Sequence, residues 1–508
     1  MMNGDADVPA WLESGEPLGV RGPVTRIETH AAMVFLAGDR AWKIKRPVDL
    51  GYLNFSTAQA RRDVLCEELR LNRRTAPDLY IAVHAITREG GRLALDGDGE
   101  AVDWVLEMRR FADDALLDRR AQEGGLDELL LRRLVDAIVD FHASADIGPR
   151  EGGAERVRRV IEGNAASMAA SPSIIAPAVA EDLWQRQQAL LARHAALLNA
   201  RAEARRVRRV HGDLHLGNIA LIDGVPTPFD CLEFDADLAT IDLLYDLAFL
   251  LMDLWARGMR REANIVFNRY IDRSAADEDG IALLPLFMSM RATIRAHVLA
   301  TQARLTCDMD AEARAGRYLA LAGALIEPVP VPARLVAIGG LSGTGKSTLA
   351  RVIGGLLGCP PGARILRSDV LRKRLANVAI ETALDPDAYT AQASRAVYAE
   401  LDRLAGAALA AGQAVVADAV FGSAAERASI EQKARATGVP FKGVWLFLPE
   451  SERIRRIAAR GPDASDATAA VARWQSEAIA TPDGGWISLP AAGGLDDLEA
   501  AAIRLLER

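Results

Sequence analysis

One eight-residue stretch constrains this chain more than any other. Residues 340–347 read Gly-Leu-Ser-Gly-Thr-Gly-Lys-Ser and match G-x-x-x-x-G-K-S, a loop whose backbone N–H groups surround nucleotide phosphates. An apolar run over 335–338 precedes the loop, and a segment of helical character over 348–353 follows it. This is the strand–loop–helix arrangement that the motif requires, so the sequence predicts a nucleotide site in the C-terminal part of the chain.

Each kind of residue in this loop has a physical role. The glycines let the backbone turn its N–H groups inward, Lys346 reaches the β- and γ-phosphates, and the Ser347 hydroxyl is a ligand for Mg²⁺. The helix that follows directs the positive end of its dipole at the same place. We expect nucleotide contacts from Gly340, Leu341, Ser342, Gly343, Thr344, Gly345, Lys346, Ser347 and Thr348.

A second phosphoryl-transfer pattern lies far upstream. Residues 211–218 read His-Gly-Asp-Leu-His-Leu-Gly-Asn, and Phe-Asp follows at 229–230. An aspartate in such a loop can accept a hydroxyl proton, while an Asn carbonyl and a second carboxylate can hold Mg²⁺. Upstream, Lys43 lies on an expected strand, and Glu67 and Glu68 lie on the helix after it, which would supply a Lys–Glu pair for the α- and β-phosphates.

Composition excludes several other classes. With 508 residues, the chain has room for two or three domains. A nucleic-acid-binding protein usually carries a basic surplus, so the formal net charge of −8 argues against that partner. The four cysteines have no C-x-x-C spacing, which argues against a zinc site or a disulfide framework. No secretion signal opens the chain and no apolar run reaches the roughly 20 residues of a spanning helix, so we expect a cytoplasmic protein without a membrane partner.

The pattern of apolar residues divides the chain. Residues 19–111 read as strand-rich, and 126–325 read as mostly helical, except for a loop rich in Gly and Ser over 148–177 that contains a short helix. Alternating prolines make 326–333 an extended spacer. In 334–508, apolar β-type runs alternate with helices, which is typical of a parallel α/β sheet.

The upstream motif resembles the catalytic loop of the aminoglycoside phosphotransferase and choline kinase family, a branch of the protein-kinase-like fold. The resemblance spans about 19–325, after a tail over 1–18, and implies a bilobal α+β domain. It implies that Asp213 is the catalytic base, that Asn218 and Asp230 are metal ligands, and that Lys43 contacts phosphate. Glu67 or Glu68 would be the partner of Lys43, Lys45 could replace Lys43, and Glu107 and Met108 would meet adenine through their backbone groups.

This half departs from its family at one point. No Gly-x-Gly-x-x-Gly loop precedes Lys43, because the corresponding turn, 29–32, reads Thr-His-Ala-Ala. The alternative reading is that one half is a non-catalytic nucleotide-binding regulator, or that the whole chain is an ATP-gated interaction module. A resistance enzyme would place an acidic cluster around a polycationic drug, and the candidates are Asp235, Asp237, Asp242 and Asp246. For Asp242 and Asp246 a bracing role is the simpler interpretation, as is a core position for His142.

Further carboxylates sharpen the prediction for the C-terminal half. Asp418 ends an apolar strand, where it can hold the Mg²⁺ shell. Asp369 follows the strand at 364–366, so it would face the γ-phosphate and take a proton from an acceptor hydroxyl, although an N-cap role is the alternative. Arg367 and Arg372 could orient a polar or anionic acceptor by paired hydrogen bonds.

An arginine-rich segment after the last long strand is a candidate lid. Arg456 and Arg460 lie on it, and arginines on such a segment can close over ATP and stabilise charge. This half, from about 333 to 508, resembles the small P-loop kinases of the gluconate kinase, chloramphenicol phosphotransferase and zeta-toxin group. That resemblance implies that Asp369 is the base acting on a small-molecule hydroxyl.

The sequence therefore predicts a kinase-like α+β domain over 19–325 followed by a P-loop α/β domain over 334–508. The predicted function is a bifunctional, ATP- and Mg²⁺-dependent phosphotransferase with one active site per domain. The expected acceptors are small molecules with hydroxyl groups, of the sugar, amino sugar or polyol type. The sequence specifies neither which acceptor is used nor the oligomeric state.

Overall fold

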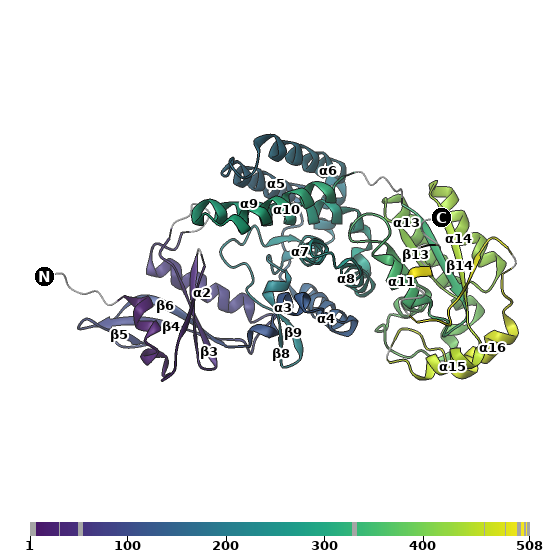
Figure 1. Ribbon diagram of the computed structural model, residues 1–508, viewed down its shortest axis with the longest axis horizontal. Helices are drawn as coiled ribbons and strands as arrows, with labels where there is room; N and C mark the ends of the chain where they lie inside the picture. Colours follow the sequence, from purple (N-terminus) through teal and green to yellow (C-terminus); the bar gives the residue numbers. More distant parts are fainter. Residues whose placement is uncertain are drawn as a thin grey trace. The chain divides into compact units, whose positions relative to one another are not determined.

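The computed structural model describes residues 7–29, 31–48, 54–327, 333–461, 463–482, 484–494, 499–501 and 504 (Figure 1). Its internal contacts divide the chain into two compact units, which are described separately here. One unit comprises 1–151 and 202–246, and the other comprises 152–201 and 247–508. Residues 328–332 of the expected proline-rich spacer lie outside the described residues.

The first unit opens on a six-stranded antiparallel sheet in the order β1-β2-β3-β6-β4-β5. Its strands are β1 (Thr25–Glu28), β2 (Ala32–Ala37), β3 (Arg40–Lys45), β4 (Tyr80–Glu89), β5 (Arg92–Leu95) and β6 (Glu100–Arg109). The expected hairpin turn joins β2 to β3, where Gly38 has a φ of 59°. Alternate residues of β2 and β3, such as Phe35 and Ile44, form a core on one face.

The expected N-terminal tail contributes to this core. Residues 8–13 form helix α1 (Val8–Glu13) and residues 16–18 form a 3₁₀ turn, η1 (Glu16–Leu18). Leu12 on α1 is fully buried among the side chains of β2 and β3. The described part of the expected tail is therefore packed against the sheet.

Helix α2 (Ala58–Asn72) packs against β6 and β4. Thr57 caps this helix, because the Thr57 hydroxyl accepts a hydrogen bond from the Ala60 N–H at 3.1 Å. This packing directs Glu68, which has no exposed side-chain surface, toward the sheet.

The remainder of the first unit carries the upstream motif. Its elements are η2 (Asp113–Ala115), α3 (Leu117–Gln122), α4 (Glu128–Ser144), β7 (Val207–Arg209), η3 (Leu216–Asn218), β8 (Ile219–Ile222), β9 (Val225–Pro228) and β10 (Thr240–Asp242). Strands β8 and β9 form a hairpin whose turn, Asp223-Gly224, has positive φ at both residues, as a tight hairpin turn requires. The unit boundaries fall within α6 (Pro177–Glu203) and α7 (Leu243–Ala256).

The helices of the second unit differ from expectation at one place. Besides α6 and α7, they are α5 (Gly153–Ala169), α8 (Arg260–Arg273), η4 (Ala275–Leu283), α9 (Leu284–Thr306) and α10 (Met309–Leu325). The helix expected within the loop over 148–177 is longer than the short one predicted, because α5 fills most of this segment. Val157, Ile161 and Met168 recur at helical spacing and are buried, so packing outweighs the Gly and Ser content.

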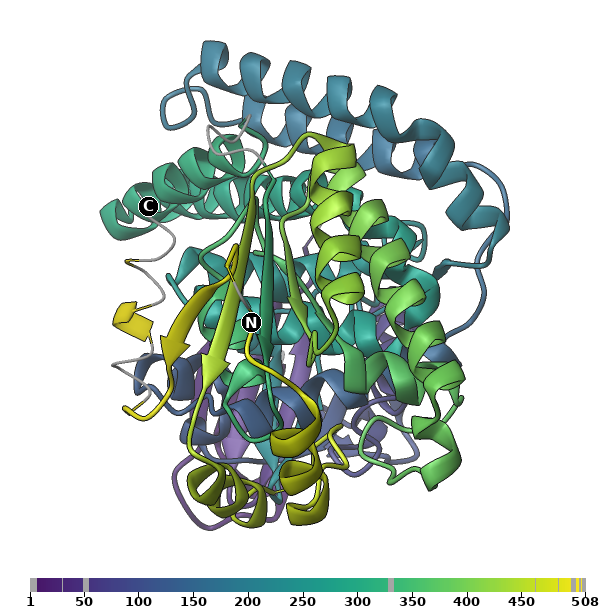
Figure 2. The ribbon, with the colours of Figure 1, turned by 90° about the vertical axis from the view of Figure 1, so that its right-hand side faces the viewer.

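The second unit also contains the predicted parallel sheet, in the order β12-β13-β11-β14-β15 (Figure 2). Its strands are β11 (Leu335–Gly340), β12 (Arg364–Arg367), β13 (Val415–Asp418), β14 (Phe441–Phe447) and β15 (Ile487–Pro490), and only β15 was not expected. Its helices are α11 (Lys346–Gly354), α12 (Ser368–Leu375), η5 (Pro386–Tyr389), α13 (Ala391–Ala410), α14 (Ala424–Thr437), α15 (Glu450–Ala458) and α16 (Ala469–Ala478).

The fold class is therefore confirmed: a kinase-like α+β part is followed by a P-loop α/β part. Two buried clusters, one containing Leu335 and Val415 and the other Val336 and Val416, lie on opposite faces of the parallel sheet. Neighbouring strand residues thus belong to different cores, as in a sheet covered on both faces. Among the described residues, no helix is long and apolar enough to span a membrane.

Candidate active sites

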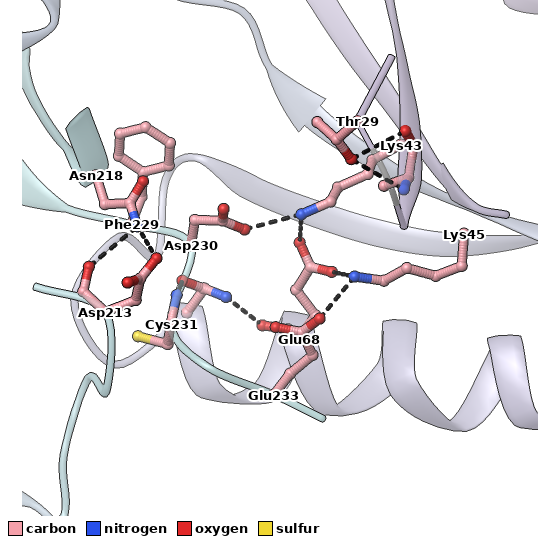
Figure 3. A network of polar contacts seen from close by, with 12 residues as sticks. Thr29, Lys43, Lys45, Glu68, Asp213, Asn218, Phe229, Asp230, Cys231 and Glu233 are labelled. Atoms are coloured by element: carbon pink, nitrogen blue, oxygen red, sulfur yellow. Dashed lines mark hydrogen bonds and ion pairs between the residues drawn. The ribbon is translucent and has the colours of Figure 1, made fainter. Parts of the chain in front are cut away.

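The upstream motif folds into a loop that brings its aspartate and asparagine together. The Asn218 side-chain amide donates to the Asp213 carboxylate at 2.8 Å and to the Asp213 carbonyl at 3.0 Å (Figure 3). The Asp213 side chain keeps 39% of its surface exposed, whereas Asn218 is buried. A carboxylate held in this way can meet a substrate hydroxyl while its orientation stays fixed.

Buried side chains form hydrogen bonds with the backbone of this loop. The Asp246 carboxylate accepts hydrogen bonds from the backbone N–H groups of His211 at 3.1 Å and Gly212 at 2.8 Å. It also lies 3.1 Å from Nε2 of His142. Asp246 and His142 thus have the bracing and core positions expected of them, and Asp242 accepts from the Leu244 N–H. Asp242 and Asp246 are both buried, so neither presents a carboxylate to a polycationic ligand.

Two histidines of the motif form hydrogen bonds with backbone groups. Burial lowers the pKa of His211, so its ring is neutral near pH 7, and its Nε2 donates to the Phe229 carbonyl at 3.0 Å. Nδ1 of His215 accepts from the Gly217 N–H at 3.0 Å. The ring of His215 also lies 3.6 Å from the Asp213 carboxylate.

Asp230 follows the β8–β9 hairpin and lies between the loop and the sheet (Figure 3). Its φ of 61° is in the left-handed region, and its backbone N–H donates to the Tyr80 hydroxyl at 3.1 Å. Its carboxylate lies 2.8 Å from Nζ of Lys43. Burial opposes ionisation of this carboxyl, but the Lys43 ammonium outweighs burial and holds the pKa of Asp230 below its ordinary value.

A buried network of alternating charges extends from Asp230. Glu68 receives Nζ of Lys43 on one carboxylate oxygen and Nζ of Lys45 on the other, each at 2.7 Å. Lys45 continues to the Glu233 carboxylate at 2.7 Å. Burial opposes the charge on Lys43, yet the facing carboxylates of Asp230, Glu68 and Glu233 hold its pKa well above the ordinary value. Both lysines considered from the sequence therefore take part, and Glu233 carries no motif that identifies it in the sequence.

The structure distinguishes the two candidate glutamates. Glu68 faces Lys43, whereas Glu67 points to Arg70 on the same helix at 2.7 Å. Glu67 is one position along α2, so it lies on another face of the helix. Of the two glutamates expected as partner of Lys43 at the cofactor site, Glu68 is therefore the one that contacts it, and Glu67 does not.

Glu107 and Met108 also lie elsewhere than expected. Both are inside β6, where Met108 pairs with Ala41 of β3 and Tyr80 of β4. The Glu107 side chain lies 3.0 Å from the side chains of Arg40 and His84. Strand β6 ends at Arg109, so both residues lie within the sheet and not in the connection that follows it.

The P-loop forms between β11 and α11 with the conformation that its glycines permit. Gly340, Gly343 and Gly345 have φ values of 139°, 86° and 93°. A Cβ at Gly343 would lie 2.7 Å from the Arg453 carbonyl oxygen, and one at Gly340 would lie 2.5 Å from that of Leu446. Glycine is therefore required there both by backbone conformation and by space.

Ser347, Asp418 and Lys346 meet beside this loop. The Ser347 hydroxyl donates to the Asp418 carboxylate at 2.6 Å, and Nζ of Lys346 donates to the Leu341 carbonyl at 3.2 Å. Burial lowers the pKa of Lys346, although Asp418 and Asp369 oppose that shift. A hydroxyl beside a carboxylate at the end of a strand is a donor set that suits Mg²⁺.

Asp369 lies in the first turn of α12, directly after the end of β12, the strand next to β13. The N-cap of this helix is Arg367, without a side-chain cap, so the alternative N-cap role does not describe Asp369. Burial raises the pKa of Asp369, while Arg367, Lys346 and a hydrogen bond with Ser465 oppose the shift. A raised pKa brings a carboxylate closer to the range in which it acts as a general base.

The expected arginines have definite partners. Arg367 lies 3.5 Å from the Asp418 carboxylate and 2.5 Å from that of Asp463. Arg372 donates to the Ala388 carbonyl at 2.5 Å, and its guanidinium lies 4.7 Å from the centre of the Tyr389 ring. Arg372 thus belongs to the wall of the site, whereas Arg367 is held by two carboxylates.

These groups surround one cavity of about 1000 Å³. Its walls include Lys346, Ser347, Asp369, Arg372, Asp418, Arg456 and Arg460. Arg456 and Arg460 both line this cavity, where Arg456 donates to the Ala491 carbonyl at 2.9 Å and Arg460 to the Ser465 carbonyl at 2.8 Å.

Three residues of this site were missed in the sequence. The Gln475 side chain accepts from the Ser342 N–H at 2.7 Å, and Arg453 donates to the Ser342 carbonyl at 3.2 Å. Lys373, fully buried, forms an ion pair with Asp466 of the segment between α15 and α16. The helix periodicity around α15 places Arg453 on the buried face, which was an available signal, but nothing in the sequence marks Gln475.

Comparisons with known proteins agree with this geometry. The model described as "Phosphotransferase enzyme family" matches residues 70–284, and the model described as "AAA domain" matches residues 335–482. An uncharacterized protein of Mycobacterium tuberculosis (strain H37Rv) is 30% identical over 453 residues, which are 88% of this chain and 88% of that protein. An uncharacterized protein of Mycobacterium bovis matches equally well.

Solved structures resemble the two parts separately. A choline/ethanolamine kinase family protein from Mesorhizobium loti is 16% identical, with a TM-score of 0.39, and the match covers 63% of this chain and 94% of that one. A gluconokinase from Sinorhizobium meliloti is 21% identical, with a TM-score of 0.25, and the match covers 35% and 94%. At these TM-scores the likeness adds nothing to the assignment. The chain belongs to the same family as the mycobacterial proteins, and its two matched domains make it an ATP-dependent phosphotransferase.

Proposed function

We propose that the chain is a bifunctional phosphotransferase, with one active site in each matched domain and small-molecule hydroxyl compounds as acceptors. The observation that carries the proposal is that both sites contain an aspartate close to groups suited to phosphate and Mg²⁺. In the first site these are Asp213, Asn218 and Lys43, and in the second Asp369, Asp418 and Lys346.

In the first site, Asp213 would accept the proton of the acceptor hydroxyl as its oxygen attacks the γ-phosphorus of ATP. The bond from that phosphorus to the bridging oxygen breaks, and ADP leaves with the electron pair. Lys43 would turn from Asp230 toward the α- and β-phosphates, because Glu68 holds its Nζ in reach. Asn218 and Asp230 would hold Mg²⁺, which neutralises charge on the phosphates when bound.

In the second site, the turned-in backbone of the P-loop and Lys346 would hold the phosphates, and Asp369 would take the acceptor proton. Ser347 and Asp418 would hold Mg²⁺. Among the described residues, no group of three or more His, Cys, Asp or Glu side chains could hold a metal by itself. Mg²⁺ usually takes one or two protein ligands together with substrate phosphates and water, and each site offers it two, Asn218 and Asp230 in the first and Ser347 and Asp418 in the second.

The proposed acceptors are sugars, amino sugars or polyols. Support comes from the polar wall of the second cavity, where Arg372, Tyr389 and Ser394 lie near Asp369 and offer hydrogen bonds to hydroxyl groups. The cavity of about 1000 Å³ is at the upper end of small-molecule pockets, so it can hold a nucleotide beside a small acceptor. Because ATP is the donor, we place both reactions in the cytoplasm.

The test is ATP turnover by the full chain against a metabolite library, with phosphorylated products identified by mass spectrometry. We expect Asp213→Asn to remove one set of products and Asp369→Asn to remove another. Loss of all products from either single change would contradict independent sites.

One observation favours a regulatory role for the first domain: residues 29–32, which correspond to the family's Gly-rich phosphate loop, contain no glycine to bring the backbone close to phosphates. Binding of two nucleotides per chain, with every product dependent on Asp369 and none on Asp213, would establish that alternative. Binding with no acceptor-dependent ADP release at either site would instead indicate an interaction module.

A further inference from the structure

The edge of the parallel sheet is completed by a helix from outside the P-loop domain. Strand β12 is the last in the sheet, so one side of its backbone has no partner strand. In the same compact unit, helix α8 supplies the missing partners: Oδ1 of Asn268 accepts from the Ile365 N–H at 2.7 Å. Nδ2 of Asn264 donates to the Ala363 carbonyl at 2.9 Å. Side-chain amides thus replace a neighbouring strand at an edge that would otherwise be unpaired.

A buried ion cluster fixes the same strand. Arg364 of β12 has no exposed surface, and its guanidinium lies 2.8 Å from the Asp272 carboxylate and 2.7 Å from that of Glu278. Glu278 also binds Arg374 of α12 at 3.0 Å. Burial opposes ionisation of Glu278, but the two arginines outweigh it and hold its pKa below the ordinary value. Asp272 lies in the last turn of α8 and Glu278 lies on η4, so both elements hold β12, and η4 also holds α12.

Two glycines allow helix α8 to reach the phosphate-binding helix as well. A Cβ at Gly354 would lie 2.3 Å from the Asn264 side-chain oxygen, and one at Gly355 would lie 2.6 Å from the Arg260 carbonyl. Gly354 is the last residue of α11, whose first residue is Lys346. Helix α8 therefore contacts the end of the nucleotide-binding helix and the first two residues of β12, Arg364 and Ile365.

Strand β12 ends beside the residues of the proposed P-loop active site. It is four residues long, its last residue is Arg367, and Asp369 follows two residues later in the first turn of α12. Arg367 pairs in register with Asp418 of β13. A shift of Arg364 or Ile365 along the strand would move Arg367 and Asp369 relative to Asp418 and the P-loop.

We propose that α8 and η4 position the P-loop active site, with Asn268, Asp272 and Glu278 acting through β12 on Asp369. These three residues lie in the stretch matched by the phosphotransferase model, 70–284, so one domain supplies positioning residues for the other. This inference rests on the proposed function for the role of Asp369. The P-loop active site would then depend on residues from both matched domains.

The experiment uses the full chain carrying Asp213→Asn, so that ADP formed from ATP and water reports on the P-loop site. Asn268→Ala is compared with Arg269→Ala, which changes the next residue of α8, paired with Glu381 at the rim of the same contact. We expect Asn268→Ala to lower kcat about tenfold or more while KM for ATP stays within about twofold, because the phosphate loop is untouched. The amides of 365–369 should exchange hydrogen about tenfold faster, since their local unfolding becomes easier. Arg269→Ala should change none of these quantities.

Arg364→Met and Arg364→Lys give a second pair of variants. Arg364→Met should lower kcat, and Arg364→Lys, which keeps the positive charge, should lower it less. Wild-type kcat and wild-type exchange over 365–369 in folded Asn268→Ala would overturn the proposal. So would faster exchange spread equally over β11, β13 and β14, because that indicates a merely structural role. If the Asp213→Asn chain releases no ADP that depends on Asp369, water does not replace the acceptor hydroxyl, and the exchange pattern alone decides the positioning. The proposed function itself is decided separately, by the products formed from the metabolite library.

Discussion

The two candidate sites bring an aspartate and a lysine to the same kind of chemistry by different physical means. In the first, Lys43 is held by the side chains of Glu68 and Asp230, within a network that also includes Lys45 and Glu233. In the second, the phosphate-binding geometry is built into the backbone by glycines at positive φ, and Lys346 bonds to the loop itself. The stability of the first site should therefore depend on the balance of its buried charges, and nucleotide binding at the second site should depend on backbone conformation.

Lys45→Met should give the largest effect and test the first half of this comparison. Lys45 is almost fully buried between Glu68 and Glu233, so its loss leaves two buried carboxylates without their shared cation. We expect a destabilisation of about 3–5 kcal/mol, measured by denaturant unfolding at pH 7. Lys45→Arg, which keeps the charge, should lose much less. Equal unfolding free energies for Lys45→Met and the parent chain would show that the network does not depend on charge balance.

Gly343→Ala tests the second half of the comparison. The new Cβ would meet the Arg453 carbonyl and would force alanine to a φ of 86°. We expect nucleotide affinity at the P-loop site to fall by about tenfold to a hundredfold, as about 1–3 kcal/mol of strain predicts. Calorimetry with Mg²⁺-ATP should then lose one of two binding events.

Gly412→Ala is the matched control for that substitution. Gly412 has a φ of 84°, but a Cβ there meets nothing within 4 Å. It should lower stability by about 1 kcal/mol through backbone strain while nucleotide affinity stays unchanged. Loss of affinity in both glycine variants would mean that global strain, and not the loop, controls binding.

The pH dependence of the two activities should differ. Burial raises the pKa of Asp369 above its ordinary value, so this proposed base of the P-loop site should become protonated, and inactive, at a pH higher than for an ordinary aspartate. The pKa of Asp230 is shifted downward, so this proposed Mg²⁺ ligand of the first site should stay ionised to lower pH. As pH falls, the product that depends on Asp369 should therefore decline first. Coincident acid limbs of the two kcat profiles would contradict this assignment.

The smallest effect is expected for Glu67→Gln, beside its matched change Glu68→Gln. Glu67 is partly exposed and pairs with Arg70, and pairs of this kind contribute about 0–1 kcal/mol. Glu67→Gln should keep product formation at the first site, whereas Glu68→Gln removes the charge that holds Lys43 and Lys45. Similar losses in the two variants would show that the Lys43–Glu68 contact has no special role.

Local patterns predicted most of the elements around these sites. The strand-rich region over 19–111, the helical region after it and the strand–helix alternation around the P-loop all appear where the sequence indicates. The failures have a common origin. Helix α5 forms in a segment rich in Gly and Ser because its apolar face is buried, and β15 forms because β14 offers it a partner. Tertiary packing outweighs local propensity in both segments.

The sequence by itself determined that a phosphate-binding loop and an Asp–Asn catalytic loop exist, because their glycines and short spacings act within a few residues of chain. Only the tertiary structure decided that Glu68 and not Glu67 meets Lys43, and that Glu233 joins the network 188 residues away from Lys45. It also decided that Asn268 completes the edge of β12. These contacts depend on which faces of distant elements are packed together, and burial then gives them their strength, since charges and amides removed from water must find partners inside the protein.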